Sequence, residues 1–324
     1  MRDLRPLSPR FLPCIHILLG SRGYSNKIFM SHLLKLALLL AGAVCAVTPA
    51  QAQMPFYTDD PEVTARGTLH FEFFNEFDAL QSSELPNLRQ NTANFKLNYG
   101  LPYNLELDLD APYLSIYRAP GTQGAAGIGD TNLGLKWKFH SASPGSHVPA
   151  LATSLYIEFP TGNQRQQLGS GLTDYWLNFI AQEPFTDKTR LNMNLGILFA
   201  GNTSTGVIGV QTRRGQVYTG GVSLLHDFRP RLTLGGEVFV AIADTPGLAR
   251  TQLQFLGGGQ YAIREGFSLT FGLIAGKYAA SPRIGGQLGF AWDIARFGAP
   301  RNYNSSPAVK LGPVTSGLSE RRSQ

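Results

Sequence analysis

Strict alternation of apolar and ionised residues is the feature that most constrains how this chain folds. The stretch 105–113 reads LELDLDAPY, in which leucines alternate with three carboxylates. Successive side chains of an extended backbone point to opposite faces, so a strand would sort the leucines from the carboxylates. A helix, with its period of 3.6 residues, would mix the two sets. The stretch is therefore predicted to be a strand with one apolar and one ionised face.

The same period-two pattern recurs through most of the chain. Twelve strands are predicted, at 68–80, 89–99, 105–113, 130–140, 151–159, 174–183, 191–201, 216–228, 232–243, 251–262, 267–275 and 284–294. Their length of 9–13 residues suits tilted strands that cross a bilayer. An even number of strands is what a closed antiparallel barrel requires when both chain ends lie on one side. The predicted fold is all-β, an antiparallel transmembrane β-barrel of about 12 strands.

The lengths of the connections indicate how the barrel is oriented. Outer-membrane barrels have short periplasmic turns and longer outer loops. If the first strand starts in the periplasm, the outer connections lie at 81–88, 117–129, 160–173, 202–215, 244–250 and 276–283. The inner ones, such as 100–104, 184–188, 229–231 and 264–266, are mostly shorter, with 141–148 a mild exception.

A soluble sandwich or a lipocalin-like barrel also has strands with one apolar face. The polar faces of this chain, however, carry carboxylates, lysines and many amides, which a closed membrane barrel can hide from lipid around its lumen. Twelve strands tilted by about 40° give a backbone radius of roughly 12 Å, enough for a narrow bore once side chains are added. We therefore favour the membrane barrel.

The two ends of the chain are not expected to belong to the barrel. A basic and polar start after Met30, an apolar run at 36–47 and the A-x-A site before Gln53 are typical of a secretory signal cleaved after Ala52. Residues 1–52 are thus interpreted as an upstream extension plus a signal peptide, 53–67 as a periplasmic lead-in, 68–295 as the barrel and 296–324 as a disordered tail.

Removal of the signal changes what the composition implies. Both cysteines, at 14 and 45, precede the cleavage site, so the mature chain is expected to have neither a disulfide nor a thiolate ligand. Residues 53–295 hold 17 Lys and Arg against 20 Asp and Glu, a formal charge of −3. The pI of about 9.3 therefore comes from the chain ends. No nucleic-acid partner is predicted.

Ionised residues of the predicted lumen gather on its first four strands. The set is Glu72, Glu76, Asp78, Lys96, Glu106, Asp108, Asp110, Asp130, Lys136 and Lys138. The opposite wall is predicted to be mostly amide and hydroxyl. The charged set could be an ion-pair lattice that stiffens the wall or a lining that favours cations. The lattice is preferred, because unpaired interior charge is costly and lysines are at hand.

Enzymatic and metal chemistry find little support in the residues. A barrel lipase needs a serine activated by an oriented histidine, and His70, His140, His147 and His226 do not stand in the H-x-S-N-G pattern. Nearby lysines favour ion pairing of Asp108 and Asp110 over Ca²⁺ binding. The glycine groups at 127–129 and 257–259 lack the Lys-Ser/Thr of a phosphate loop. No catalytic residue, metal ligand or cofactor is predicted.

Several short motifs follow one another in a fixed order. They are PFYTDDP at 55–61, Asn98-Tyr99-Gly100 followed by Glu106, Gly127-Ile128-Gly129-Asp130 leading to Gly134 and Lys136, and Pro160-Thr161-Gly162 followed by Gly169 and Gly171. Through these motifs residues 55–293 resemble the outer-membrane β-barrel family named for the meta-cleavage (MetA) pathway of phenol degradation. The resemblance implies a Gram-negative outer-membrane protein that passes hydrophobic or aromatic solutes, and it brings no catalytic residues.

Two aspartates of the first motif have two interpretations. Asp59 and Asp60 could plug or bind at the periplasmic mouth, or they could cap the turn before the first strand, which is preferred.

The working hypothesis is a passive, porin-like channel of the outer membrane for small, aromatic or hydrophobic solutes. The alternatives are a non-conducting structural or surface-adhesive barrel and, less favoured, a lipid-modifying enzyme. The expected partners are outer-membrane lipid, a small-molecule solute and the barrel-assembly machinery, with a monomer as the expected state.

Overall fold

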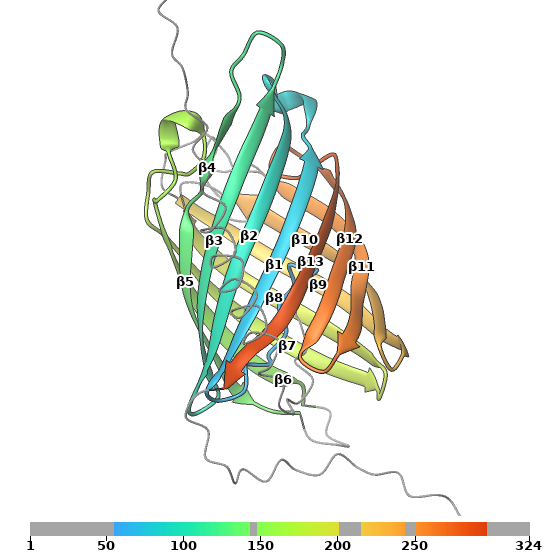
Figure 1. Ribbon diagram of the computed structural model, residues 1–324. Coiled ribbons are helices and arrows are strands. Elements are labelled where there is room, and N and C mark those ends of the chain that lie inside the picture. The colour runs from blue at the N-terminus through green and yellow to red at the C-terminus, as the bar shows by residue number, and fades with distance from the viewer. Residues whose placement is uncertain (1–54, 143–147, 201–214, 244–250, 297–324) are drawn as a thin grey trace, which may run out of the picture. The chain divides into compact units, whose positions relative to one another are not determined.

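A computed structural model describes residues 55–142, 148–200, 215–243 and 251–296. In these ranges the chain forms one closed antiparallel barrel (Figure 1). The strands are β1 (Thr68–Ala79), β2 (Asn87–Leu101), β3 (Leu105–Arg118), β4 (Ala125–Ile128), β5 (Thr131–His140), β6 (Ala150–Phe159), β7 (Asp174–Thr186), β8 (Thr189–Ala200), β9 (Gly215–Arg229), β10 (Leu232–Ala243), β11 (Gln252–Arg264), β12 (Phe267–Lys277) and β13 (Ile284–Arg296). Two short 3₁₀ turns, η1 (Ser82–Glu84) and η2 (Gln164–Gln166), lie in outer connections.

Pairing of the first strand with the last closes the barrel. β1 pairs with both β2 and β13, and the other pairs join neighbours in the sequence except that β3 pairs with β5 as well as with β4. β4 and β5 together occupy one position in the wall, because β4 pairs with the outer part of β3 and β5 with its inner part. The barrel therefore has twelve strand positions, and the predicted fold is confirmed.

One prediction about the connections is wrong. Residues 125–128 were expected in an outer loop, but they form β4 and extend the wall beyond β5. The segment is short and holds no charged residue, so its sequence shows no alternation of the kind that marks the other strands.

The two faces of the strands separate as the alternation predicts. On β3 the side chains of Leu107 and Leu109 are 40% and 47% exposed, whereas Glu106 and Asp108 are buried. The same division holds around the described part of the ring, where the exposed large side chains are mostly aliphatic or aromatic. An apolar outer belt around a closed barrel is what a bilayer requires, since closure pairs the backbone polar groups.

No helix within the described ranges is long and apolar enough to cross a membrane.

Candidate functional site

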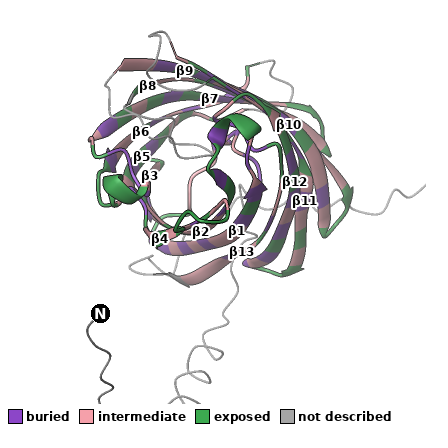
Figure 2. Ribbon diagram, turned by 90° about the horizontal axis from the view of Figure 1, so that it is seen from above, coloured by how far each residue is buried: buried purple, intermediate pink, exposed green. Residues whose placement is uncertain are grey.

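The lead-in before β1 lies inside the barrel, where its backbone is bound to three parts of the wall. The Thr58 amide donates to Glu237 Oε2 of β10 at 2.5 Å. The Gln287 side chain of β13 donates to the Pro55 carbonyl at 2.5 Å. The Thr64 amide donates to Glu106 Oε2 of β3 at 2.5 Å. The view from above shows chain within the ring of strands (Figure 2).

This placement corrects the expectation of a periplasmic lead-in. Of the range 53–67, residues 53 and 54 lie outside the described part, and the segment from Pro55 to Thr64 contacts inward-facing side chains. The physical reason is that a segment with two aromatic rings and many polar groups can satisfy both on the inner wall. Carboxylates there accept its amides, and apolar side chains pack against its rings.

Ion pairs hold the lead-in to the charged side of the lumen. Asp59 lies 3.1 Å from Lys136 Nζ, and Glu62 lies 2.6 Å from Lys138 Nζ. Lys136 is fully buried, whereas the side chain of Glu62 is 43% exposed. The first pair is therefore shielded from water and the second is not. We name the segment from Pro55 to Thr64 the inner segment.

Asp59 and Asp60 have different roles within the inner segment. Asp59 binds the wall through Lys136. Asp60 is buried, and its Oδ1 accepts the Glu62 amide at 2.8 Å. Asp59 Oδ1 also accepts the Asp60 amide at 2.9 Å, so both aspartates bind a local backbone amide and Asp59 binds the wall as well.

The ten charged residues named from the sequence fall into three groups. The largest follows the register across β1, β2, β3 and β5, where Glu72 is opposite Lys96, Lys96 is opposite Asp110, and Glu106 is opposite Lys136. Asp108 belongs to this group, with its Oδ2 accepting the Tyr156 hydroxyl at 2.8 Å. Lys138 lies on the same face of β5 and binds Glu62.

The second group is the carboxyl pair Glu76 and Asp78, nearer the outer end of β1. Both are buried, and Glu76 Oε2 accepts the Tyr57 hydroxyl at 2.5 Å. These two residues are thus separate from the lysine-containing group, and the inner segment supplies the donor to Glu76.

Asp130 forms the third group alone and anchors an outer loop. Its Oδ1 accepts the Gly162 amide at 2.9 Å and its Oδ2 accepts the Ser170 amide at 2.6 Å. A Cβ on Gly169 would come within 2.2 Å of Asp130 Oδ1, so that position has no room for a side chain. Leu168 of this loop is buried against the inward-facing Leu114 and Ile116. The glycine motifs around 127–130 and 160–171 therefore build one loop anchor at the outer rim.

An apolar wall faces the charged one, and sequence reasoning did not find it. Phe56 packs against Leu225, Leu256 and Ile274, and Tyr57 packs against Phe239 with ring centroids 6.0 Å apart. The amides and hydroxyls predicted for this wall are present and buried, and the apolar residues share their face. The available signal was the phase of the apolar residues, since Leu225 and Phe239 are in step with the inward polar positions of β9 and β10.

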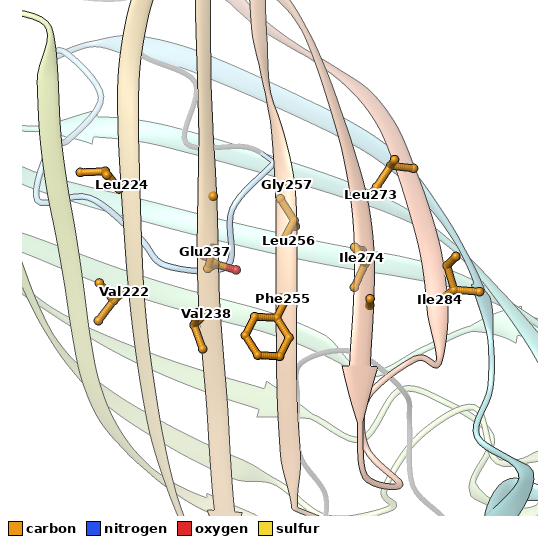
Figure 3. A pocket seen from close by; sticks show the side chains of 12 residues that line it. Val222, Leu224, Glu237, Val238, Phe255, Leu256, Gly257, Leu273, Ile274 and Ile284 are labelled. Atoms are coloured by element: carbon orange, nitrogen blue, oxygen red, sulfur yellow. The ribbon is translucent and has the colours of Figure 1, made fainter.

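A hollow of about 650 Å³ lies on the bilayer-facing surface behind this wall (Figure 3). Its lining combines outward-facing side chains, such as Val222 and Phe255, with Leu256 and Ile274 of the inner wall itself. A Cβ on Gly257 would meet no atom within 4 Å, so the missing side chain there opens the surface. The hollow is apolar and open to lipid.

Replacement of Asp60 by Asn is expected to strengthen binding of the inner segment to the inner wall of the barrel near neutral pH. Burial raises the pKa of Asp60 from 3.8 to about 6, although nearby Lys136 opposes the rise. Asp60 thus binds its proton more tightly when the inner segment lies on the wall than when the segment is released. Binding of the segment to the wall therefore weakens as the pH rises from about 4 to about 6 and then levels off. A shift of about two pKa units corresponds to about 3 kcal/mol.

The measurement is the rate at which a maleimide labels a cysteine placed at Thr58, between pH 4 and pH 7. Maleimide reacts with the thiolate, so both proteins label faster as the pH rises. The quantity compared is therefore the rate of the aspartate form divided by that of D60N, which keeps the acceptor for the Glu62 amide, and this ratio should increase with pH. The two proteins differ only at this residue, so the difference between them reports Asp60. Equal pH profiles would contradict the assignment.

His70 is not placed to act as a general base. Both ring nitrogens of His70 are engaged by carboxylates, with Nδ1 at 2.7 Å from Asp293 and Nε2 at 3.2 Å from Glu72. That leaves neither nitrogen to activate a hydroxyl. Within the described ranges, no group of three or more His, Cys, Asp or Glu side chains could hold a metal ion.

Comparison with known proteins agrees with the barrel fold. The chain is similar to the COG4313 outer membrane channel from Pseudomonas putida F1, with a TM-score of 0.58 and 14% identity over 72% of this chain and 97% of that one. The KdgM porin gives a TM-score of 0.46 and 9% identity over 69% of this chain and 98% of that one. No curated protein matches the chain.

The fold and its apolar belt are those of an outer-membrane β-barrel protein. The family model described as MetA-pathway of phenol degradation matches residues 56–293, which include the inner segment from Phe56 onward and all thirteen strands except the last residues of β13. The chain therefore belongs to that family of outer-membrane barrels.

Proposed function

We propose that the protein is a passive channel of the outer membrane for small hydrophobic solutes, aromatic ones included. The observation that carries the proposal is the apolar inner wall. Near the outer ends of β8, β9 and β10 it consists of Leu198, Val217 and Ala241, and it continues inward through Phe239 to Leu256. A wall for hydrated solutes alone would have no need of buried apolar side chains on the lumen side.

The charged wall lies opposite this apolar inner wall and determines which ions can pass. Carboxylates outnumber lysines there, so the ions that pass with water are proposed to be cations. The lysines lie beside carboxylates and hold the inner segment, which narrows the lumen. Small hydrophobic solutes are therefore favoured over large hydrophilic ones.

A non-conducting, structural or surface-adhesive barrel is the second candidate, and one observation favours it. The inner segment occupies the lumen and is bound to β1, β3, β5, β10 and β13. A permanently seated segment would leave no path. The two candidates differ in whether solute crosses the wild-type protein.

The test is uptake of a labelled small aromatic hydrocarbon by cells whose outer membrane contains lipopolysaccharide, with and without the protein. A channel should raise the initial rate several-fold, whereas the structural barrel should leave it at the vector level. Leu256→Gln, which places an amide on the apolar inner wall, should lower the uptake rate, and the matched Leu256→Met should preserve it. Uptake equal to that of the vector would refute the channel. Equal uptake rates for the two variants would refute passage of the solute along the apolar inner wall.

A further inference from the structure

The Tyr57 side chain occupies a site on the inner wall whose shape fits a phenol. We call this site the seat. The Tyr57 ring lies against Phe239 at 6.0 Å between centroids, with the planes tilted by 43°. Its hydroxyl donates to Glu76 Oε2 at 2.5 Å. A tyrosine side chain is chemically a 4-alkylphenol, and these contacts involve only its ring and hydroxyl. A free phenol could therefore make every one of them.

The acceptor of the seat makes it selective for a hydroxyl donor. Glu76 is buried beside Asp78 and its Oε2 accepts the Tyr57 hydroxyl, so loss of that donor would leave a buried carboxylate oxygen unsatisfied. Burial raises the pKa of the Tyr57 hydroxyl well above its usual value, and the nearby Glu76 and Asp78 add to the rise, so the hydroxyl stays protonated and donates. An alkylbenzene or an ether cannot supply that hydrogen bond.

The neighbouring residue shows that the wall is fitted to aromatic rings. Phe56 is buried against Leu225, Leu256 and Ile274. A Cβ on the inward-facing Gly235 would lie 3.1 Å from Phe56 Cζ, so a side chain there would crowd the ring. The Phe56 and Tyr57 rings thus occupy adjoining places on one apolar surface, and only the second has a polar acceptor at its end.

The inner segment can leave the seat without breaking the barrel, because it lies before β1 and belongs to no strand. Its attachments are side-chain and single-amide contacts, among them Thr58 N to Glu237 and Asp59 to Lys136. A solute that binds the vacated seat would compete with Tyr57 for the same contacts. Binding of the solute and release of the segment are then linked.

We propose that the lumen contains a binding site for 4-alkylphenols, with Glu76 as the hydroxyl acceptor and Phe239 beside the ring, and that Tyr57 fills this site as a built-in competitor. The inference deepens the proposed channel function by naming the class of solute at one position of its apolar inner wall. It assigns Tyr57 a role beyond occluding the lumen, because a phenol that makes the same contacts as the Tyr57 side chain would displace that side chain.

The experiment is a calorimetric titration of the purified mature protein in lipid nanodiscs with 4-ethylphenol. The wild type should bind weakly, and Tyr57→Ala should lower Kd at least about tenfold, because the competitor is gone. Tyr57→Phe, which keeps the ring but loses the hydroxyl, should lie between the two. Tyr261→Ala, an exposed outer-face tyrosine, is the matched control and should bind as the wild type does.

A second probe tests the hydroxyl. In Tyr57→Ala, 4-ethylanisole, which has no donor, should bind roughly 10- to 100-fold more weakly than 4-ethylphenol, the range for a hydrogen bond to a charged acceptor. Folding of each variant is checked by its heat-dependent migration in detergent gels. No gain in affinity in either Tyr57 variant, or equal affinity for the two probes, would overturn the proposal.

The outcome is separable from that of the uptake test. Normal uptake of hydrocarbon with no phenol binding would remove the site and leave the channel. Phenol binding without uptake would keep the site and remove the channel.

Discussion

Deletion of residues 55–64 is expected to raise single-channel conductance by at least roughly fivefold, because the bore of a twelve-stranded barrel is otherwise shared with this segment. The deletion removes the rings of Phe56 and Tyr57 and the partners of Glu76, Glu237 and Lys136. Water can then fill the lumen and solvate the released charges, so the barrel itself should remain folded. The measurement is conductance in planar bilayers.

The control for this deletion is Val63→Ala, which shortens one side chain of the same segment and leaves the bonds of Thr58, Asp59 and Thr64 in place. Its conductance should match that of the wild type. An increase confined to the deletion would identify the inner segment as the main obstruction. Unchanged conductance in the deletion would mean that another part of the chain closes the bore.

The barrel could be predicted from the sequence because alternation is a local property. Each of Glu106, Asp108 and Asp110 has apolar neighbours at odd positions, and a strand is the only regular structure that separates them. The number of strand positions followed from repeating this observation. The structure extends β3 to Arg118 and β7 to Thr186, where the pattern fades before the pairing ends.

The apolar inner wall could not be predicted in the same way. The run Val238-Phe239-Val240-Ala241 is apolar on both faces, so polarity alone cannot say which side points inward. The structure places Phe239 and Ala241 inside, in phase with Glu237. A count of positions from Glu237 would have identified them, because the period of two fixes the face of every residue in an unbroken strand.

The position of the inner segment depends on contacts between residues far apart in the chain. The Thr58 amide and Glu237 are separated by 179 residues. No local rule links them, since their meeting depends on closure of the barrel and on its radius. Within the motif PFYTDDP only Asp59 and Asp60 were interpreted, as a plug at the periplasmic mouth or as a cap of the turn, and the two aromatic residues gave no prediction.

Substitution of Lys136 by Met is expected to cost about 3 to 5 kcal/mol of stability in the closed, seated state. Lys136 is fully buried and stands opposite Glu106, and its Nζ lies 3.1 Å from Asp59. Methionine fills a similar volume but brings no charge, so the carboxylates that faced the lysine are left without a cation. The inner segment should detach, because release lets water reach them.

Lys138→Met is the matched control, since it lies two residues along the same face of β5. Its partner Glu62 has a side chain that is 43% exposed, so water screens the pair and the loss should stay below about 1 kcal/mol. The measurements are the midpoint of thermal unfolding in detergent and maleimide labelling of a cysteine at Thr58. Lys136→Met should lower the midpoint and speed labelling, and adding Asp59→Asn should restore part of both. Equal behaviour of the two lysine variants would show that the buried cation does not hold the segment.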